Sequence, residues 1–139
     1  MNNVVARLRA IVGKENVLVG DEIGEEYGCD EALTVKSCLP EVVVKPGSAE
    51  EVAKILSLAS EEKIPVTPRG GGTGMSGGCV AVCGGILLSL EGMNRILEID
   101  EDKCVAVVEA GVVLADLYKA VEARGLCYPI YPGEESATI

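Results

Sequence analysis

The first forty residues combine one helical pattern with an irregular acidic stretch. Residues 2–12 carry apolar side chains at helical spacing and are followed by Gly13, which predicts a short amphipathic helix ending there. Residues 20–40 are acidic, rich in glycine and without a regular period. We expect them to run as an extended segment over the surface. Residues 1–40 are therefore interpreted as an N-terminal helix and a variable lead-in.

A β-α-β unit is predicted from residue 41 onward. Residues 41–45 form a β-branched run that Pro46-Gly47 ends, which indicates a strand followed by a turn. Ser48 and Glu51 have the spacing of a capping box, so a helix begins here. A short strand at 66–67 completes the unit. The apolar face of the helix is predicted to contain Val52, Ile55, Leu56 and Ala59.

The second half of the chain predicts three strands and one helix. Residues 85–90 form a continuous apolar run, as in a buried strand. Residues 96–100 and 104–109 flank a polar turn and predict a β-hairpin. Residues 112–124 predict a helix that Gly125 ends. The apolar face of this helix is predicted to contain Leu114, Leu117, Tyr118 and Val121.

A glycine loop, residues 68–78 with the sequence PRGGGTGMSGG, lies between the β-α-β unit and these later elements. Glycine loses much conformational entropy on folding, so such a run indicates backbone that turns through positive φ or approaches a bulky group closely. Main-chain N–H groups, the hydroxyls of Thr73 and Ser76 and the guanidinium of Arg69 would together suit a diphosphate. A flexible surface loop is the alternative interpretation.

Residues 72–77 satisfy the spacing G-x-G-x-x-G, but the sequence after them does not favour a Rossmann site. A Rossmann fingerprint opens a helix whose N-terminus meets the pyrophosphate. Here Gly84 and Gly85 follow, with no amphipathic pattern between the loop and the next strand. A P-loop would need a Lys-Ser/Thr pair, and a kinase loop would need a following strand that carries a lysine.

Composition narrows the classes of function. The formal net charge of −10 disfavours a nucleic-acid binder and docking on an anionic membrane surface. The chain contains no histidine, which excludes Ser-His-Asp and Cys-His nucleophile chemistry and histidine metal ligands within it. A hydrophobic content of 48% without Phe or Trp predicts an aliphatic core.

The cysteines do not indicate a metal centre or a disulfide framework. Cys79 and Cys83 are close, but no second pair stands at zinc-site spacing, so we expect no metal site. Together with Cys104 they lie in apolar runs and are expected to be buried thiols. Free thiols favour a cytoplasmic location. No secretory signal is recognised, and no apolar run reaches the about 20 residues that span a bilayer.

Five motifs, taken in order, resemble the FAD-binding domain of the p-cresol methylhydroxylase and vanillyl-alcohol oxidase type (PCMH type). The resemblance is greatest to the glycolate oxidase large subunit and D-lactate dehydrogenase group. The motifs are residues 40–52, 64–78, 90–100, 108–112 and 132–139. Each is weak alone, but their order is specific. The resemblance implies an α+β fold in residues 41–139: an N-terminal β-α-β subdomain and the start of a second, mostly antiparallel α+β subdomain, truncated at the C-terminus.

The resemblance also implies which residues hold the cofactor. In the family the glycine loop wraps the FAD diphosphate with main-chain donors, which here assigns Arg69, Gly70, Gly71, Gly72, Thr73, Gly74, Ser76 and Gly77. A second segment, which lies along the flavin, corresponds to Pro132, Gly133, Ser136, Ala137 and Thr138. Because the chain has no histidine for a covalent histidyl link, FAD is expected to be bound non-covalently.

The implied function is that of a flavin-dependent oxidoreductase acting on a small 2-hydroxy acid of the glycolate or D-lactate type, with hydride transfer from the substrate Cα to flavin N5. In the family, further strands and a cap follow and carry the substrate-binding and catalytic residues. We therefore expect an N-terminal part without catalytic residues, inactive alone. An iron–sulfur partner subunit is a further implied partner. Two alternatives remain: a non-catalytic FAD-binding subunit paired with a separate cap polypeptide, and a non-flavin dinucleotide-binding module.

Overall fold

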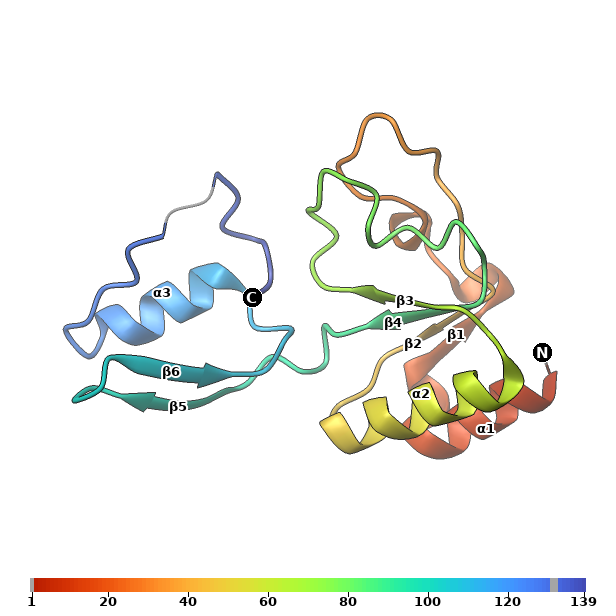
Figure 1. Ribbon diagram of the computed structural model, residues 1–139, viewed down its shortest axis with the longest axis horizontal. Helices are drawn as coiled ribbons and strands as arrows, with labels where there is room; N and C mark the ends of the chain where they lie inside the picture. The colour runs from red at the N-terminus through yellow and green to blue at the C-terminus, as the bar shows by residue number, and fades with distance from the viewer. Residues whose placement is uncertain (1, 131–132) are drawn as a thin grey trace.

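Two sheets, each packed against helices, form two lobes of the chain (Figure 1). The computed structural model describes residues 2–130 and 133–139. The first lobe contains helices α1 and α2 and strands β1 to β4, and the second lobe contains strands β5 and β6 and helix α3. The predicted α+β class and the division into a β-α-β unit and an antiparallel unit are confirmed.

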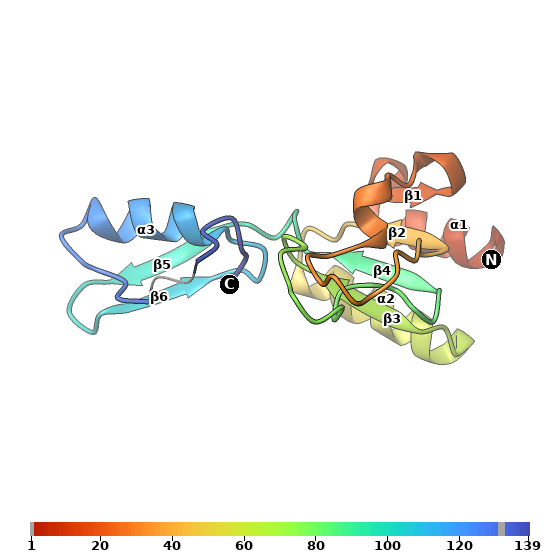
Figure 2. The same cartoon turned by 90° about the horizontal axis from the view of Figure 1, so that it is seen from above.

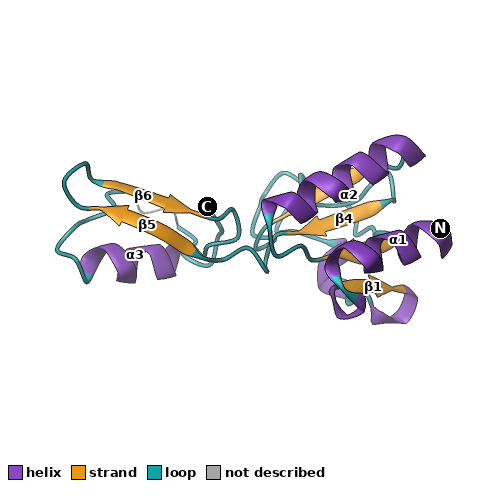
Figure 3. Ribbon diagram, turned by 90° about the horizontal axis from the view of Figure 1, so that it is seen from below, coloured by secondary structure: helices purple, strands orange, loops and turns teal. Residues whose placement is uncertain are grey.

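The first lobe is a four-stranded mixed sheet with the order β1-β2-β4-β3. Strands β2, β4 and β3 are parallel, and β1 runs antiparallel to β2. The strand bounds are β1 Val17–Val19, β2 Val42–Val44, β3 Val66–Arg69 and β4 Ile86–Ser89. Helices α1 (Asn2–Val12) and α2 (Ala49–Glu62) lie next to each other on one face of this sheet (Figure 2, Figure 3).

The two central strands are buried on both faces, which explains why β2 and β4 are continuously apolar. Val42, Val44, Ile86 and Leu88 face α1 and α2 and share one core with Leu8, Ile55 and Leu58. Val43 and Leu87 face the opposite side and pack with Ile23, Tyr27 and Ala81. Residues of the lead-in therefore cover the face of the sheet that the helices leave free.

The lead-in is irregular, as predicted, but it is not simply extended. It contains short 3₁₀ turns at Lys14–Asn16, Gly20–Glu22 and Glu25–Gly28, and strand β1 lies between the first two. The sequence analysis made no prediction for β1, a three-residue strand paired only with β2. In Figure 1 the lead-in lies beside the glycine loop, on the side of the sheet away from the helices.

Helix α2 has the predicted bounds, with two corrections at the residue level. Ser48 Oγ accepts a hydrogen bond from Glu51 N at 3.2 Å, as a capping box requires. The Glu51 carboxylate, however, accepts from Gly47 N at 2.7 Å rather than from Ser48 N. Leu56 was predicted on the apolar face, but it is exposed, and Leu58 is buried instead because the core contacts the adjacent strip of the helix.

The second lobe is the predicted hairpin covered by the predicted helix. Strands β5 (Ile96–Asp100) and β6 (Val105–Val108) pair antiparallel, with a register shift between Ile96 and Glu98. Helix α3 (Leu114–Glu122) packs on the hairpin and forms a core of its own. All four residues predicted for its apolar face are buried, namely Leu114, Leu117, Tyr118 and Val121.

The prediction of buried thiols is wrong. Cys83 and Cys104 are exposed, and Cys79 is only half-buried. Residues 78–84 form turns in which Val80 and Ala81 are buried while Cys83 faces solvent, and Cys104 lies in the hairpin turn with φ of 54°. Within residues 2–130 and 133–139, every helix is too short or too polar to span a membrane.

Candidate cofactor-binding site

The glycine loop begins where strand β3 ends, at the carboxyl edge of the parallel strands. Ligands of open parallel sheets bind beyond this edge. Pro68 is tolerated in β3 because β3 is an edge strand. Residues 70–85 are all described and form only turns and bends, so the loop opens no helix and a Rossmann pyrophosphate site is excluded.

Three glycines of the loop stand where a Cβ would collide with a neighbouring side chain. Gly72 has φ of +76°, and a Cβ there would lie 2.1 Å from Arg69 Nη2. A Cβ at Gly77, which has φ of +77°, would lie 2.5 Å from Val35 Cγ2, and a Cβ at Gly70 would lie 2.0 Å from Thr138 Oγ1. The loop therefore packs against the lead-in and the C-terminal segment, and it is not a loop free in solvent.

The main-chain donors of the loop fit a diphosphate. Within the described part of the chain, no residue accepts a hydrogen bond from the N–H groups of residues 72–76. The loop lines a hollow of about 270 Å³. Successive unpaired N–H groups in such a turn favour an anion, and FAD carries one in its diphosphate. The hollow is lined by Asp30, Gly70, Gly71, Gly72, Thr73, Gly74, Ser76, Gly78, Cys79 and Thr138.

Arg69 is buried beside the loop, with 8% of its surface exposed. Its Nη1 donates to Cys29 O at 2.6 Å and contacts Cys79 Sγ at 3.4 Å. Its Cζ lies 5.9 Å from the centre of the Tyr27 ring. The guanidinium therefore supports the loop through the lead-in and brings a positive charge to the wall of the site.

The C-terminal segment meets the glycine loop through Thr138. Thr138 Oγ1 accepts from Gly71 N at 3.3 Å, and a Cβ on Gly71 would lie 3.0 Å from Ser136 O. The segment is held in place by the first turn of α3, because Leu114 N donates to Ala137 O at 2.9 Å. The structure thus brings Ser136, Ala137 and Thr138 to the site.

The rest of the predicted flavin segment is not brought to the loop by the contacts described. Gly133 is exposed, and a Cβ there would meet nothing within 4 Å. Pro132 lies outside the described residues. Ser136 N donates to Glu134 Oε1 at 2.9 Å, and hydrogen bonds from the Ser136 side chain and main chain lower the pKa of Glu134.

A second hollow of about 380 Å³ adjoins the first and shares Gly70, Gly71 and Thr138 with it. The sequence analysis missed most of its lining, which includes Glu26, Tyr27, Glu91, Asn94, Gly111 and Val113. Lys45 Nζ forms an ion pair with Glu91 at 2.5 Å and lies 5.3 Å from the Tyr27 ring centre. Burial opposes protonation of Lys45, but the contacts with Glu91 and Tyr27 outweigh it and raise the Lys45 pKa.

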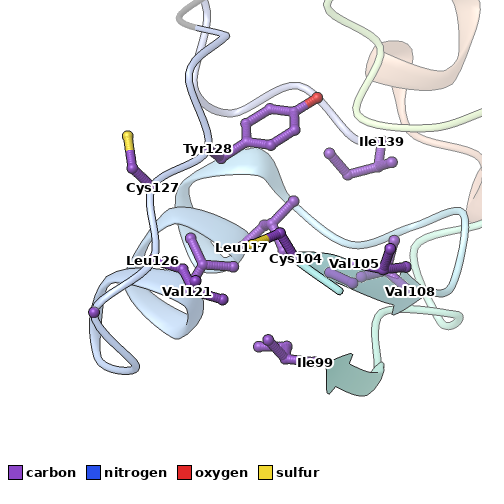
Figure 4. Close-up of a pocket in the computed structure, with 12 residues that line it drawn as sticks. Ile99, Cys104, Val105, Val108, Leu117, Val121, Leu126, Cys127, Tyr128 and Ile139 are labelled. Carbon is purple, nitrogen blue, oxygen red and sulfur yellow. The ribbon is translucent and has the colours of Figure 1, made fainter. Parts of the chain in front are cut away.

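A third hollow, of about 400 Å³, lies in the second lobe between the hairpin and α3 (Figure 4). Its described lining is aliphatic except for Tyr128, Cys104, Cys127 and Gly125, and it includes no charged side chain. Such a surface does not suit a diphosphate. The groups that suit an anionic cofactor therefore lie at the glycine loop.

Comparison with known proteins identifies the family of the chain. The family of FAD binding domains matches residues 40–139. The whole chain is 47% identical to an uncharacterized FAD-linked oxidoreductase of Mycobacterium tuberculosis and covers 30% of it. A D-lactate dehydrogenase of Anaerostipes hadrus is 45% identical over 92% of the chain and 27% of its own length. A glycolate oxidase subunit of Bacillus subtilis is 43% identical over 68% of the chain and 20% of its own length.

Solved structures show the same fold. The chain superposes on p-cresol methylhydroxylase with a TM-score of 0.78 and 29% identity, covering 90% of this chain and 25% of that one. Alkyldihydroxyacetonephosphate synthase, at 21% identity, shows the fold alone, with a TM-score of 0.89 over 99% of this chain and 28% of that one. The chain spans no more than 30% of the curated relatives described above. The chain belongs to the FAD-binding domain family of FAD-linked oxidoreductases, and its fold is of the PCMH type.

Proposed function

We propose that the glycine loop and residues Ser136 to Thr138 bind FAD non-covalently for an oxidoreductase that acts on a small 2-hydroxy acid. The observation that carries this proposal is the set of N–H groups at residues 72–76 that have no acceptor in the described part of the chain, beside a hollow lined by the predicted loop residues. Arg69, Gly70, Gly71, Gly72, Thr73, Gly74, Ser76 and Gly77 would surround the diphosphate. Pro132, Gly133, Ser136, Ala137 and Thr138 would lie toward the flavin.

The substrate class is supported by the names of the relatives, a D-lactate dehydrogenase and a glycolate oxidase subunit. When bound, FAD would supply the redox chemistry by accepting a hydride from the substrate Cα at its N5. The residues of this chain would bind and orient the cofactor and keep water from its diphosphate. We further propose a cytoplasmic location, an iron–sulfur subunit as a partner, and no turnover by the 139-residue chain alone.

An absorbance spectrum with and without added FAD tests cofactor binding. We expect purified protein to be yellow, or to become so after FAD is added and the excess removed by gel filtration. Colourless protein after that treatment would contradict the proposal and favour a non-flavin dinucleotide. Heat or acid treatment that releases all of the flavin would support non-covalent binding, whereas flavin that stays with the precipitated protein would contradict it.

Turnover assays with an artificial electron acceptor test the substrate class and the division of labour. We expect the full-length polypeptide to oxidise D-lactate or glycolate, and the 139-residue chain to show no turnover. Activity of the short chain would overturn the proposal that the catalytic residues lie outside it. A flavin-loaded full-length protein that oxidises neither acid would overturn the substrate class but not FAD binding.

A further inference from the structure

Residues 29–31 of the lead-in form three hydrogen bonds with the glycine loop, and we call these three residues the latch. Asp30 Oδ2 accepts a hydrogen bond from Gly77 N at 2.8 Å. Glu31 N donates to Gly74 O at 2.9 Å, and Cys29 O accepts from Arg69 Nη1 at 2.6 Å. Three consecutive residues thus hold the beginning, middle and end of a loop that lies 40 or more positions further along the chain.

Both oxygens of the Asp30 carboxylate accept a hydrogen bond from the main chain. Its Oδ1 accepts from Ala32 N at 3.0 Å, while Oδ2 accepts from Gly77 N. Gly77 has φ of +77°, a left-handed conformation that glycine adopts readily. The charge-assisted hydrogen bond from Gly77 N to Asp30 selects one arrangement for the end of the loop.

The negative charge of Asp30 lowers the affinity of the site for an anionic ligand. The side chain lines the same hollow as the glycine loop, and a carboxylate near a bound diphosphate is repelled by it. Electrostatic attraction to a diphosphate therefore does not explain why residue 30 is an aspartate. The hydrogen bond from Gly77 N to its side chain does. A loop already held in its binding conformation loses less entropy when a ligand binds.

We infer that Asp30 is a positioning residue that orders the glycine loop for the cofactor without attracting it. The identity of the ligand in this inference rests on the proposed function, whereas the effect of Asp30 on the loop does not. The hydrogen bond and the charge of Asp30 then have opposite effects on affinity. A substitution that removes both the acceptor and the charge should weaken FAD binding. A substitution that removes the charge but retains one acceptor oxygen should not.

Three variants of the full-length polypeptide separate these effects. Asp30→Ala removes the acceptor and the charge, Asp30→Asn keeps one acceptor oxygen for Gly77 N, and Asp21→Ala removes an exposed carboxylate of the same lead-in as a matched control. FAD titration should show affinity reduced by about tenfold or more in Asp30→Ala, in line with one charge-assisted hydrogen bond. Asp30→Asn should stay within about threefold of wild type or bind more tightly, since the repulsion is lost.

Amide hydrogen exchange of the FAD-free proteins provides a readout that does not depend on the cofactor. In Asp30→Ala we expect faster exchange at Gly77, which loses its acceptor, and at Glu31, whose N–H donates to Gly74 O, with unchanged exchange in β2 and β4. Unaltered exchange and affinity in Asp30→Ala, or an Asp30→Asn variant as weak as Asp30→Ala, would overturn the inference. Failure of the wild type to bind FAD would instead refute the proposed function, while the exchange data still decide the role of Asp30.

Glu31→Pro covers the case in which Asp30→Ala does not fold. It deletes the donor to Gly74 O and leaves the Asp30 carboxylate in place. We expect it to speed exchange at Gly77 as well, because the loop is then less firmly held against Asp30. Exchange identical to wild type in a folded Glu31→Pro variant would overturn the inference that the latch orders the loop.

Discussion

Gly72 combines a left-handed backbone with a close side-chain neighbour. An alanine there would have φ of +76° and a Cβ 2.1 Å from Arg69 Nη2, so the guanidinium would have to move. We expect Gly72→Ala to cost about 1–3 kcal/mol of stability through backbone strain and to abolish detectable FAD binding. The measurements are a thermal melt and an FAD titration followed by flavin fluorescence.

Gly20→Ala is the matched control for this substitution. Gly20 also has positive φ, +55°, but a Cβ there would meet nothing within 4 Å. Its alanine variant should lose some stability and keep its affinity for FAD. Equal loss of FAD binding in both variants would mean that general destabilisation, and not the loop beside Arg69, explains the effect.

Thr138 links the C-terminal segment to the loop through a single side-chain hydroxyl. Thr138→Val keeps the shape of the side chain but removes the acceptor for Gly71 N. We expect a loss of about 1 kcal/mol or less in stability and several-fold weaker FAD binding, because the segment is less firmly held on the loop. Isothermal titration with FAD measures the effect. Thr34→Val, a change at an exposed threonine, is the control. If Thr138→Val bound FAD as tightly as Thr34→Val, the prediction would be contradicted.

At the scale of elements, the Glu109 carboxylate links the residue after strand β6 to Arg95, the residue before strand β5. Glu109 is 8% exposed and accepts from Arg95 N at 2.9 Å and from Arg95 Nη2 at 2.6 Å. The hydrogen bonds from the Arg95 guanidinium, and then from its main chain, hold the Glu109 pKa below the ordinary value of 4.5. The ionised form is therefore favoured in the folded state.

This shift predicts a pH dependence with a definite sign. A carboxyl group whose pKa is lower in the folded state stabilises the fold above its unfolded pKa, and the contribution is lost as pH falls below about 4.5. Glu109→Gln should therefore melt below wild type at pH 7, and the difference should shrink on acidification. Melting curves from pH 7 to pH 3 test this, with Glu98→Gln as an exposed control. A difference that stays constant down to pH 3 would refute the assignment.

Elements defined by local patterns were predictable from the sequence. The capped helix α2, the apolar strand β4 and the face of α3 each depend on residues only a few positions apart. The glycine loop was recognisable for the same reason, because its density of glycine is a local signal. The choice of Leu58 over Leu56 was not, since the direction from which the sheet approaches α2 is not encoded within the helix.

Contacts between distant residues were beyond the sequence pattern. Strand β1 is three residues long, and only its pairing with β2 makes it a strand. Asp30 is one acidic residue among many in the lead-in, and its hydrogen bond to Gly77 appears only once the chain has folded. The same holds for Tyr27, whose ring lies near both Lys45 and Arg69. Half of the candidate site was therefore visible in the sequence, and its supporting contacts were not.

At the scale of the whole molecule, the two lobes have separate cores and unequal means of stabilisation. The first lobe buries both faces of β2 and β4. The second is a two-stranded hairpin with one nine-residue helix, and its strands expose Leu97, Val105 and Val107. A hairpin of this size is marginally stable without further packing. The apolar hollow of Figure 4 adds unfilled space to this small core.

We therefore expect the second lobe of the 139-residue chain to open at a lower free energy than the first. Amides of β5 and β6 should exchange faster than those of β2 and β4 in FAD-free protein. Because the glycine loop belongs to the first lobe and Thr138 to the segment held by α3, a ligand between them contacts both lobes. Saturating FAD should slow exchange in both, by an amount that grows with ligand concentration over Kd. Protection confined to the first lobe would show that the C-terminal segment takes no part in binding, and equal exchange of both lobes without FAD would refute their unequal stability.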